Sequence, residues 1–181
     1  MQLNHLILCV VFLFFGSTSK DDTLSWTETR KLTWADFKGQ ADQNSDASAL
    51  TASGITFGYS LKTAGKRFVD YTASVEAHFY PYKSWYFKDR SNAYILRHEQ
   101  LHFDITELYV RKFRQYLERL VVNQNLKKQM NQIHNAINEG LAKTQKTYDA
   151  QTQHSINVEA QKYWENYIEE ELKKLAKYKS Q

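Results

Sequence analysis

The amino-acid sequence predicts an α+β fold in which an N-terminal β-hairpin sheet packs on one long helix, followed by two further helices. Apolar residues alternate with polar or small ones in the N-terminal half, which is typical of half-buried strands. They recur at helical spacing between about residues 91 and 122, and again in two C-terminal stretches. With 181 residues, of which 42% are hydrophobic, the chain is long enough for one domain with a substantial core.

The first nineteen residues are interpreted as a secretory signal peptide, and residues 20–181 as a single domain. The apolar run from Leu6 to Phe15 is short for a membrane span, and small residues at 16–19 offer a cleavage site. A retained anchor is the alternative. Cys9 is the only cysteine, so the mature chain can form no disulfide.

The formal net charge of +4 carries little information about partners. The basic residues are scattered, and no basic stripe interleaved with aromatic residues appears, so nucleic acid is not an expected partner. One lysine cluster, at 173–179, is expected to be a solvated helix end, where positive charge suits the helix dipole. We expect no membrane contact after signal cleavage, and the sequence does not indicate an oligomeric state.

Two strands are expected in the N-terminal half. Residues 55–61 and 69–79 both alternate between apolar and polar or small side chains, and the Thr63–Lys66 segment between them suits a hairpin turn. The aromatic residues Trp26, Trp34 and Phe37 can pack at the edge of this sheet.

The long helix expected at roughly 91–122 can begin at a cap provided by Ser91 or Asn92. A second apolar stripe predicts a helix at about 125–147, and a third stripe starts at Trp164. Polar residues at 148–155 separate these two stripes and indicate a junction.

The long helix carries the sequence His98-Glu99-Gln100-Leu101-His102, an H-E-x-x-H motif. The two histidines are one helical turn apart on one face, where both imidazoles can bind one Zn²⁺. Glu99 stands beside them and can take a proton from a water molecule activated by the zinc. The motif helix together with the hairpin sheet makes this a zincin-like arrangement.

A catalytic zinc site needs a third protein ligand. Residues further along the motif helix point elsewhere or lie too far away, so the ligand must return from the C-terminal part. The candidates are His134, Glu139, Asp149, His154 and Glu159. We favour His154, because a residue at the junction between two helices can be aimed at a metal without distorting either helix.

The stretch from Tyr94 to Leu108 resembles a bacterial family of predicted secreted zinc-dependent proteases that contain the domain of unknown function 922. Lys31–Gly39 is similar to the N-terminal part of that family, and Phe79 with Ser84 and Trp85 to its middle part. Its C-terminal pattern is matched by Tyr148, Asp149, Thr152 and His154, although Ser155 stands where that family usually has glycine. The resemblance implies a bacterial protein that is secreted or resides in the periplasm or cell envelope.

The expected function is that of a zinc metallopeptidase, a hydrolase that acts on a peptide or protein substrate. Glu99 would be the general base, and Tyr109, Tyr148 or Tyr163 would stabilise the oxyanion. Related zinc peptidases receive the substrate on an edge strand, which we expect within residues 67–79. The alternatives are a non-catalytic secreted binding domain with a structural zinc and a non-peptidase zinc amidase of the cell envelope.

Overall fold

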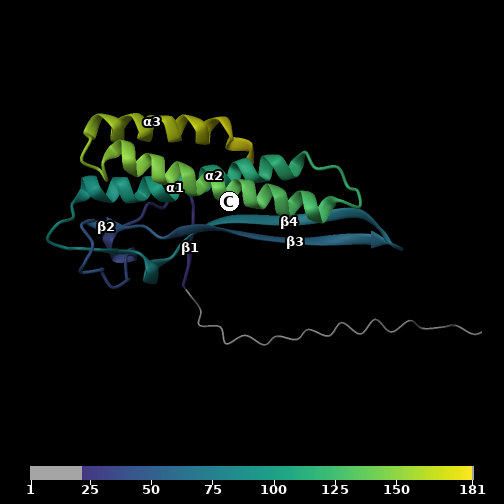
Figure 1. Ribbon diagram of the computed structural model, residues 1–181, viewed down its shortest axis with the longest axis horizontal. Helices are drawn as coiled ribbons and strands as arrows, with labels where there is room; N and C mark the ends of the chain where they lie inside the picture. Colours follow the sequence, from purple (N-terminus) through teal and green to yellow (C-terminus); the bar gives the residue numbers. More distant parts are fainter. Residues whose placement is uncertain (1–21, 181) are drawn as a thin grey trace, which may run out of the picture.

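The computed structural model describes residues 22–180, which form an α+β fold with two small antiparallel sheets and three long helices (Figure 1). One sheet has the order β1 (Leu24–Ser25), β4 (Arg67–Phe79) and β3 (Ser53–Ala64). The other pairs β2 (Ala49–Leu50) with β5 (Trp85–Tyr86). The helices are α1 (Ala93–Glu118), α2 (Leu126–Thr152) and α3 (Val158–Lys174), and three short 3-10 helices lie at Trp34–Asp36, Pro81–Lys83 and Ala176–Tyr178.

The predicted signal peptide lies outside the described residues. Within residues 22–180, none of the helices combines the length and the apolar character needed to cross a bilayer.

Strands β3 and β4 form the predicted hairpin. Ile55 pairs with Ala77 and Phe57 with Val75, so the apolar sides of both strands face the helices. Gly65 at the turn has a φ of 61°, a conformation that glycine adopts without steric cost. Strand β1 pairs only with His78 and Phe79 of β4, so among the described residues most of β4 has no strand on its β1 side, and the expectation of an edge strand within residues 67–79 stays a prediction.

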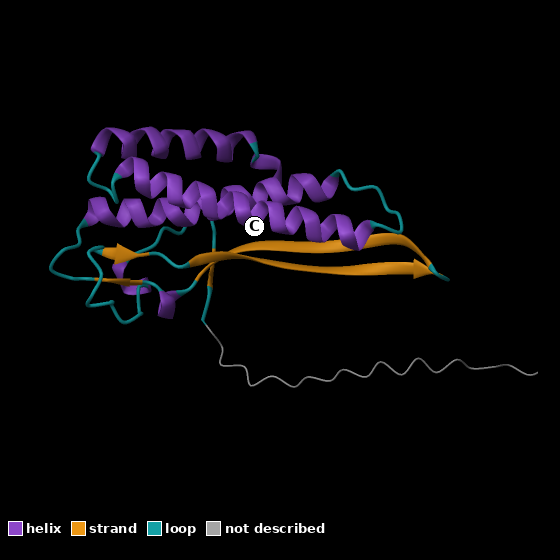
Figure 2. Cartoon of the chain, in the orientation of Figure 1, coloured by secondary structure: helices purple, strands orange, loops and turns teal. Residues whose placement is uncertain are grey.

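Helix α2 runs beside α1, and its first half also packs on the hairpin through Met130 and Ile137. Helix α1 lies between the hairpin and α3 (Figure 2). Its start is capped as predicted, because the Asn92 side chain accepts hydrogen bonds from the backbone nitrogens of Tyr94 and Ile95. Phe103 and Phe113 pack towards the sheet. The opposite face contributes to a second core with α2 and α3, which contains Leu101, Ile105, Leu108, Leu141, Tyr148, Trp164 and Ile168.

Helices α1 and α2 approach closely at Gly140. A Cβ atom at this position would lie 2.8 Å from Cε1 of Tyr109, whose hydroxyl is held 2.6 Å from Oγ1 of Thr144. Glycine therefore permits the crossing that carries the end of α2 to the start of α1, where the motif lies.

Candidate metal centre

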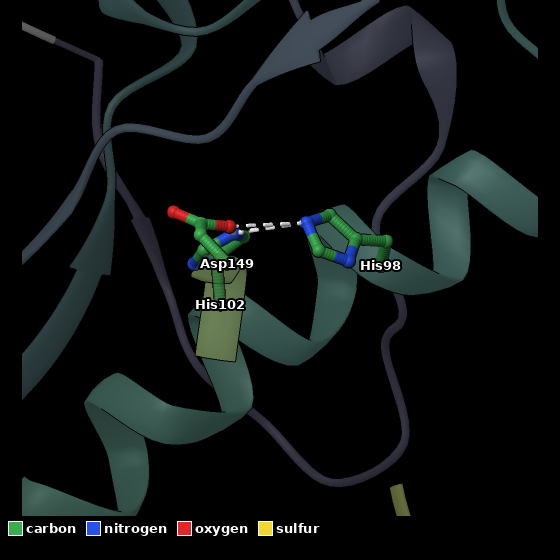
Figure 3. A group of neighbouring side chains, drawn as sticks. All are labelled: His98, His102 and Asp149. Carbon is green, nitrogen blue, oxygen red and sulfur yellow. Dashed lines mark hydrogen bonds and ion pairs between the residues drawn. The ribbon is translucent and has the colours of Figure 1, made fainter. Parts of the chain in front are cut away.

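Three potential metal ligands converge where α1 begins and α2 ends (Figure 3). They are His98 and His102 from α1 and Asp149 from α2, and one ligand atom from each lies within 4.8 Å of the others. The Nε2 atoms of the two histidines are 3.3 Å apart. Oδ1 of Asp149 lies 3.3 Å from Nε2 of His98 and 2.9 Å from Nε2 of His102.

These separations match the spacing of ligands around a tetrahedral metal ion. With metal–ligand distances of about 2.0–2.1 Å, neighbouring ligands of a tetrahedral zinc site lie about 3.3–3.4 Å apart. Two of the three separations have this value and the third is slightly shorter. Two imidazoles and one carboxylate are also a donor set that Zn²⁺ accepts in catalytic sites.

The orientation of the His102 ring is fixed by Gln145 of α2. The side-chain Nε2 of Gln145 donates a hydrogen bond to the backbone oxygen of His102 at 2.8 Å. This oxygen can only accept, so the other end of the amide, Oε1, must face Nδ1 of His102, with which it makes a short contact. Nδ1 therefore carries the hydrogen, and Nε2 presents a lone pair to the centre.

Gln161 of α3 fixes His98 in the same way. Its Nε2 donates to Oε1 of Glu165 at 3.1 Å, while its Oε1 lies 2.9 Å from Nδ1 of His98 and accepts a hydrogen bond from the Tyr148 hydroxyl at 2.7 Å. The Tyr148 ring also stacks on the His98 ring, with centroids 4.5 Å apart. His98 is thus held on one edge and one face, again with Nε2 towards the centre.

The hydrogen-bond network leaves three electron-pair donors facing one another. Two Nε2 lone pairs and a carboxylate oxygen repel unless a cation lies among them, either a proton or a metal ion. Burial alone would lower the pKa of His102, but hydrogen bonding to Asp149 and the charge of Glu99 outweigh it and raise the pKa. Burial also opposes ionisation of Asp149, yet both imidazoles hold the pKa of that carboxyl well below its ordinary value. The residues present therefore fit a metal cation.

Glu99, the predicted general base, is buried beside this group and is not one of its ligands. Its Oε2 atom is shielded from solvent and has no hydrogen-bond partner among the residues that the structure describes. The backbone oxygen of Glu99 accepts a hydrogen bond from Thr51, which precedes β3 and anchors this turn of α1 to the sheet. An unpartnered buried carboxylate oxygen is costly, and a water molecule in the centre would supply the missing donor.

The structure does not bring His154, the favoured third ligand, into the group. Its side chain is 73% exposed, and its Nδ1 atom lies 3.8 Å from Oδ1 of Asp149. Asp149, one of the alternative candidates, is the third residue of the group. Glu139 and Glu159 are exposed and stand outside the group, and His134 packs between Phe57 and Phe113.

The reason for this difference is the length of α2. The predicted helix ended near residue 147, but α2 continues to Thr152 because Tyr148 and Thr152 extend its buried stripe. Asp149 therefore projects from a helix, and the junction is confined to the turn that follows. Gln153, His154 and Ser155 there have φ values of 48°, 52° and 75°, a left-handed conformation that non-glycine residues rarely adopt.

Of the three tyrosines considered for the oxyanion, only Tyr148 contacts the histidines. It is fully buried, burial raises its pKa, and its hydroxyl is bonded to Gln161, so it orients the ligands. The Tyr109 hydroxyl is bonded to Thr144, and Tyr163 is exposed.

Gln145 and Gln161 were not expected from the sequence to support the metal centre. Gln161 occupies a position of the apolar stripe of α3, three residues before Trp164 and seven before Ile168, and is buried there. A glutamine within a buried stripe was the available signal, because buried polar groups need a partner.

Fold and site together define an α+β protein with a candidate His–His–carboxylate metal centre. The chain belongs to the family described as "Bacterial protein of unknown function (DUF922)", whose model matches residues 30–155. The matched segment contains the motif, Gln145, Asp149 and His154. No curated protein and no solved structure matches the chain.

Proposed function

We propose that this protein is an exported zinc-dependent hydrolase, with a zincin-like site that cleaves peptide bonds. His98, His102 and Asp149 would hold the Zn²⁺ ion and Glu99 would be the general base. One observation carries the proposal: a three-residue ligand group lies beside a buried carboxylate oxygen that has no hydrogen-bond partner within residues 22–180. Three protein ligands are the number that leaves one position of a tetrahedral zinc free for chemistry.

A bound Zn²⁺ ion supplies a Lewis acid that polarises the scissile carbonyl and makes water more acidic. Glu99 accepts the proton of the attacking water and passes it to the leaving amine nitrogen. Because Glu99 is buried, bulk water does not compete for its carboxylate. Gln145 and Gln161 keep both imidazoles in the orientation that binds the metal.

Substrate reaches the centre from the side of Asp149. Exposure of the side chains rises from 4% for His98 through 12% for His102 to 29% for Asp149, and His154 beyond it is largely exposed. The opposite side is closed by Tyr148 and Gln161, both buried. An amide substrate, either a peptide or an amide of the cell envelope, would approach from this open side.

The competing function is a binding domain with a structural zinc. Such a site normally has four protein ligands. Among residues 22–180 the group contains three, and His154 is the nearby residue that would have to move to complete it. The unpartnered oxygen of Glu99 favours the hydrolase, because a structural site has no use for a buried base.

The test combines metal analysis with substrate profiling of the protein without residues 1–19. The wild-type protein and the Glu99→Gln variant should contain equal zinc, and only the wild type should cleave members of a peptide library. Cleavage of cell-envelope amides without peptide cleavage would favour the amidase. Stoichiometric zinc with no cleavage of either substrate class would favour the binding domain.

A further inference from the structure

The two imidazoles of the centre are supported differently. Gln145, the partner of His102, donates its other hydrogen bond to a backbone oxygen, which is a neutral group. Gln161, the partner of His98, is anchored by the carboxylate of Glu165. The second arrangement forms a continuous chain from a charged side chain, through one amide, to a metal-binding imidazole.

Glu165 is well placed to act on Gln161 without touching the centre. It lies one turn further along α3, and its side chain is half-buried beside Arg97, with 3.8 Å between the Nε and Oε1 atoms. Glu165 and Arg97 line a cavity of about 670 Å³ between α1 and α3. Because a carboxylate can only accept, it requires the NH₂ end of the Gln161 amide, and the amide oxygen is then turned to His98.

The Tyr148 hydroxyl supports the same orientation. It lies 2.7 Å from Oε1 of Gln161 and 3.3 Å from the backbone oxygen of His98. The hydrogen bond that it donates to Gln161 is therefore the stronger of the two. If the amide of Gln161 turned over, its NH₂ group would face Nδ1 of His98 and the carboxylate of Glu165 would face an oxygen. Nδ1 would then present the lone pair, and Nε2 would carry the hydrogen towards the metal position.

The geometry points to Gln161 and Glu165 as one positioning unit that keeps His98 in the tautomer able to bind the metal through Nε2. This inference rests on the metal centre of the proposed function and adds a residue outside the ligand group to it. It follows that zinc affinity depends on Glu165, which contacts none of the three ligands. A negative charge moved from position 165 to position 161 should make His98 a stronger ligand, because carboxylate partners raise the basicity of metal-bound imidazoles.

Four variants test the unit. Gln161→Leu removes the partner of His98, and Glu165→Ala removes the anchor of the amide together with the ion pair to Arg97. The double variant Gln161→Glu with Glu165→Gln exchanges carboxylate and amide while keeping a donor facing an acceptor. Gln151→Met is the matched control, because it removes a hydrogen bond between α2 and α3, to Trp164, that touches no histidine.

Two measurements are made on each purified protein. Histidine tautomers are read from two-bond nitrogen–proton NMR correlations in the zinc-free protein in mildly alkaline buffer. Zinc affinity is measured by competition with a chromogenic chelator. The tautomer measurement needs neither metal nor substrate, so it tests the positioning unit even if the wild type proves to bind no zinc, a result that would reject the proposed function.

We expect Gln161→Leu to mix the tautomers of His98 and to weaken zinc binding by about 10–100-fold, as for other partners of metal-binding histidines. Glu165→Ala should change both readouts in the same direction by less. The double variant should bind zinc at least as tightly as the wild type, and Gln151→Met should match the wild type. If Gln161→Leu fails to fold, Glu165→Ala decides. Unchanged tautomer and affinity in Glu165→Ala, or a Gln151→Met protein equally impaired, would overturn the inference.

Discussion

Nε2 of His102 lies 2.9 Å from Oδ1 of Asp149, and this contact joins the first half of α1 to the last turn of α2. The same oxygen lies 3.3 Å from Nε2 of His98. The candidate centre is therefore made by the packing of α1 against α2 and not by the motif alone. The close approach of the two helices at Gly140 is part of what places Asp149 there.

Asp149, not His154, should be the third ligand. Asp149→Ala is expected to weaken zinc binding by on the order of 100-fold or more, since changes that only touch a ligand's partner already cost about 10–100-fold. His154→Ala should keep zinc, because its side chain is largely exposed and outside the group. Competition with a chelator measures both affinities, and the reverse order of losses would restore His154 as the ligand.

Glu99→Gln should abolish most hydrolysis without loss of zinc or fold. A general base of this kind typically contributes about 10²–10⁴-fold to the rate. The amide has the same size as the carboxylate and fills the same buried position, so the variant should keep the fold and the melting temperature of the wild type. Calorimetry and rate measurements on the zinc-loaded protein check this, and near wild-type turnover would refute the assignment of the base.

Much of the fold could be predicted because single-sequence patterns report local structure. Alternation predicted the strands of the hairpin, and helical spacing together with Asn92 predicted the start of α1. The motif placed His98, Glu99 and His102 together because residues one turn apart on a helix are neighbours in any fold.

The rest of the site depends on contacts between helices, which leave no periodic signal. The end of α2 was misplaced because Tyr148 and Thr152 are helical through their burial against other elements. For the same reason the choice between Asp149 and His154 could not be made from sequence. Both lie near residue 150, and only the helix end decides which of them faces the motif.

Zinc should raise the melting temperature, because a ligand that binds the native state alone stabilises it. At free zinc about 100-fold above the dissociation constant the gain is about 2.7 kcal/mol, which corresponds to about 5–11 °C for a chain of this size. Differential scanning calorimetry with and without a chelator measures the shift. Asp149→Ala is the control and should show almost none; an equal shift in that variant would mean that zinc binds elsewhere.

The zinc-free protein should be stabilised by His102 and Asp149 mainly in mildly acidic solution. Burial opposes the charge on His102, but Asp149 and Glu99 raise its pKa above the ordinary value of 6.5. Its contribution is therefore complete below pH 6.5 and is lost as the pH rises through the raised pKa. Burial likewise opposes the charge on Asp149, but the imidazoles lower its pKa below 3.8. That contribution is complete above pH 3.8 and is lost as the pH falls through the lowered pKa.

In the chelator-treated protein, the contributions of His102 and Asp149 to stability are both complete between pH 3.8 and 6.5. Urea unfolding of the wild type and of Asp149→Asn, measured across this range and on both sides of it, gives the difference in free energy of unfolding. This difference should be largest inside the window and should shrink towards both acid and alkali, because the pair is stabilised only when His102 is charged and Asp149 is ionised. A difference that stayed constant with pH, or grew steadily towards alkali, would show that the two side chains do not form a charged pair in the folded protein.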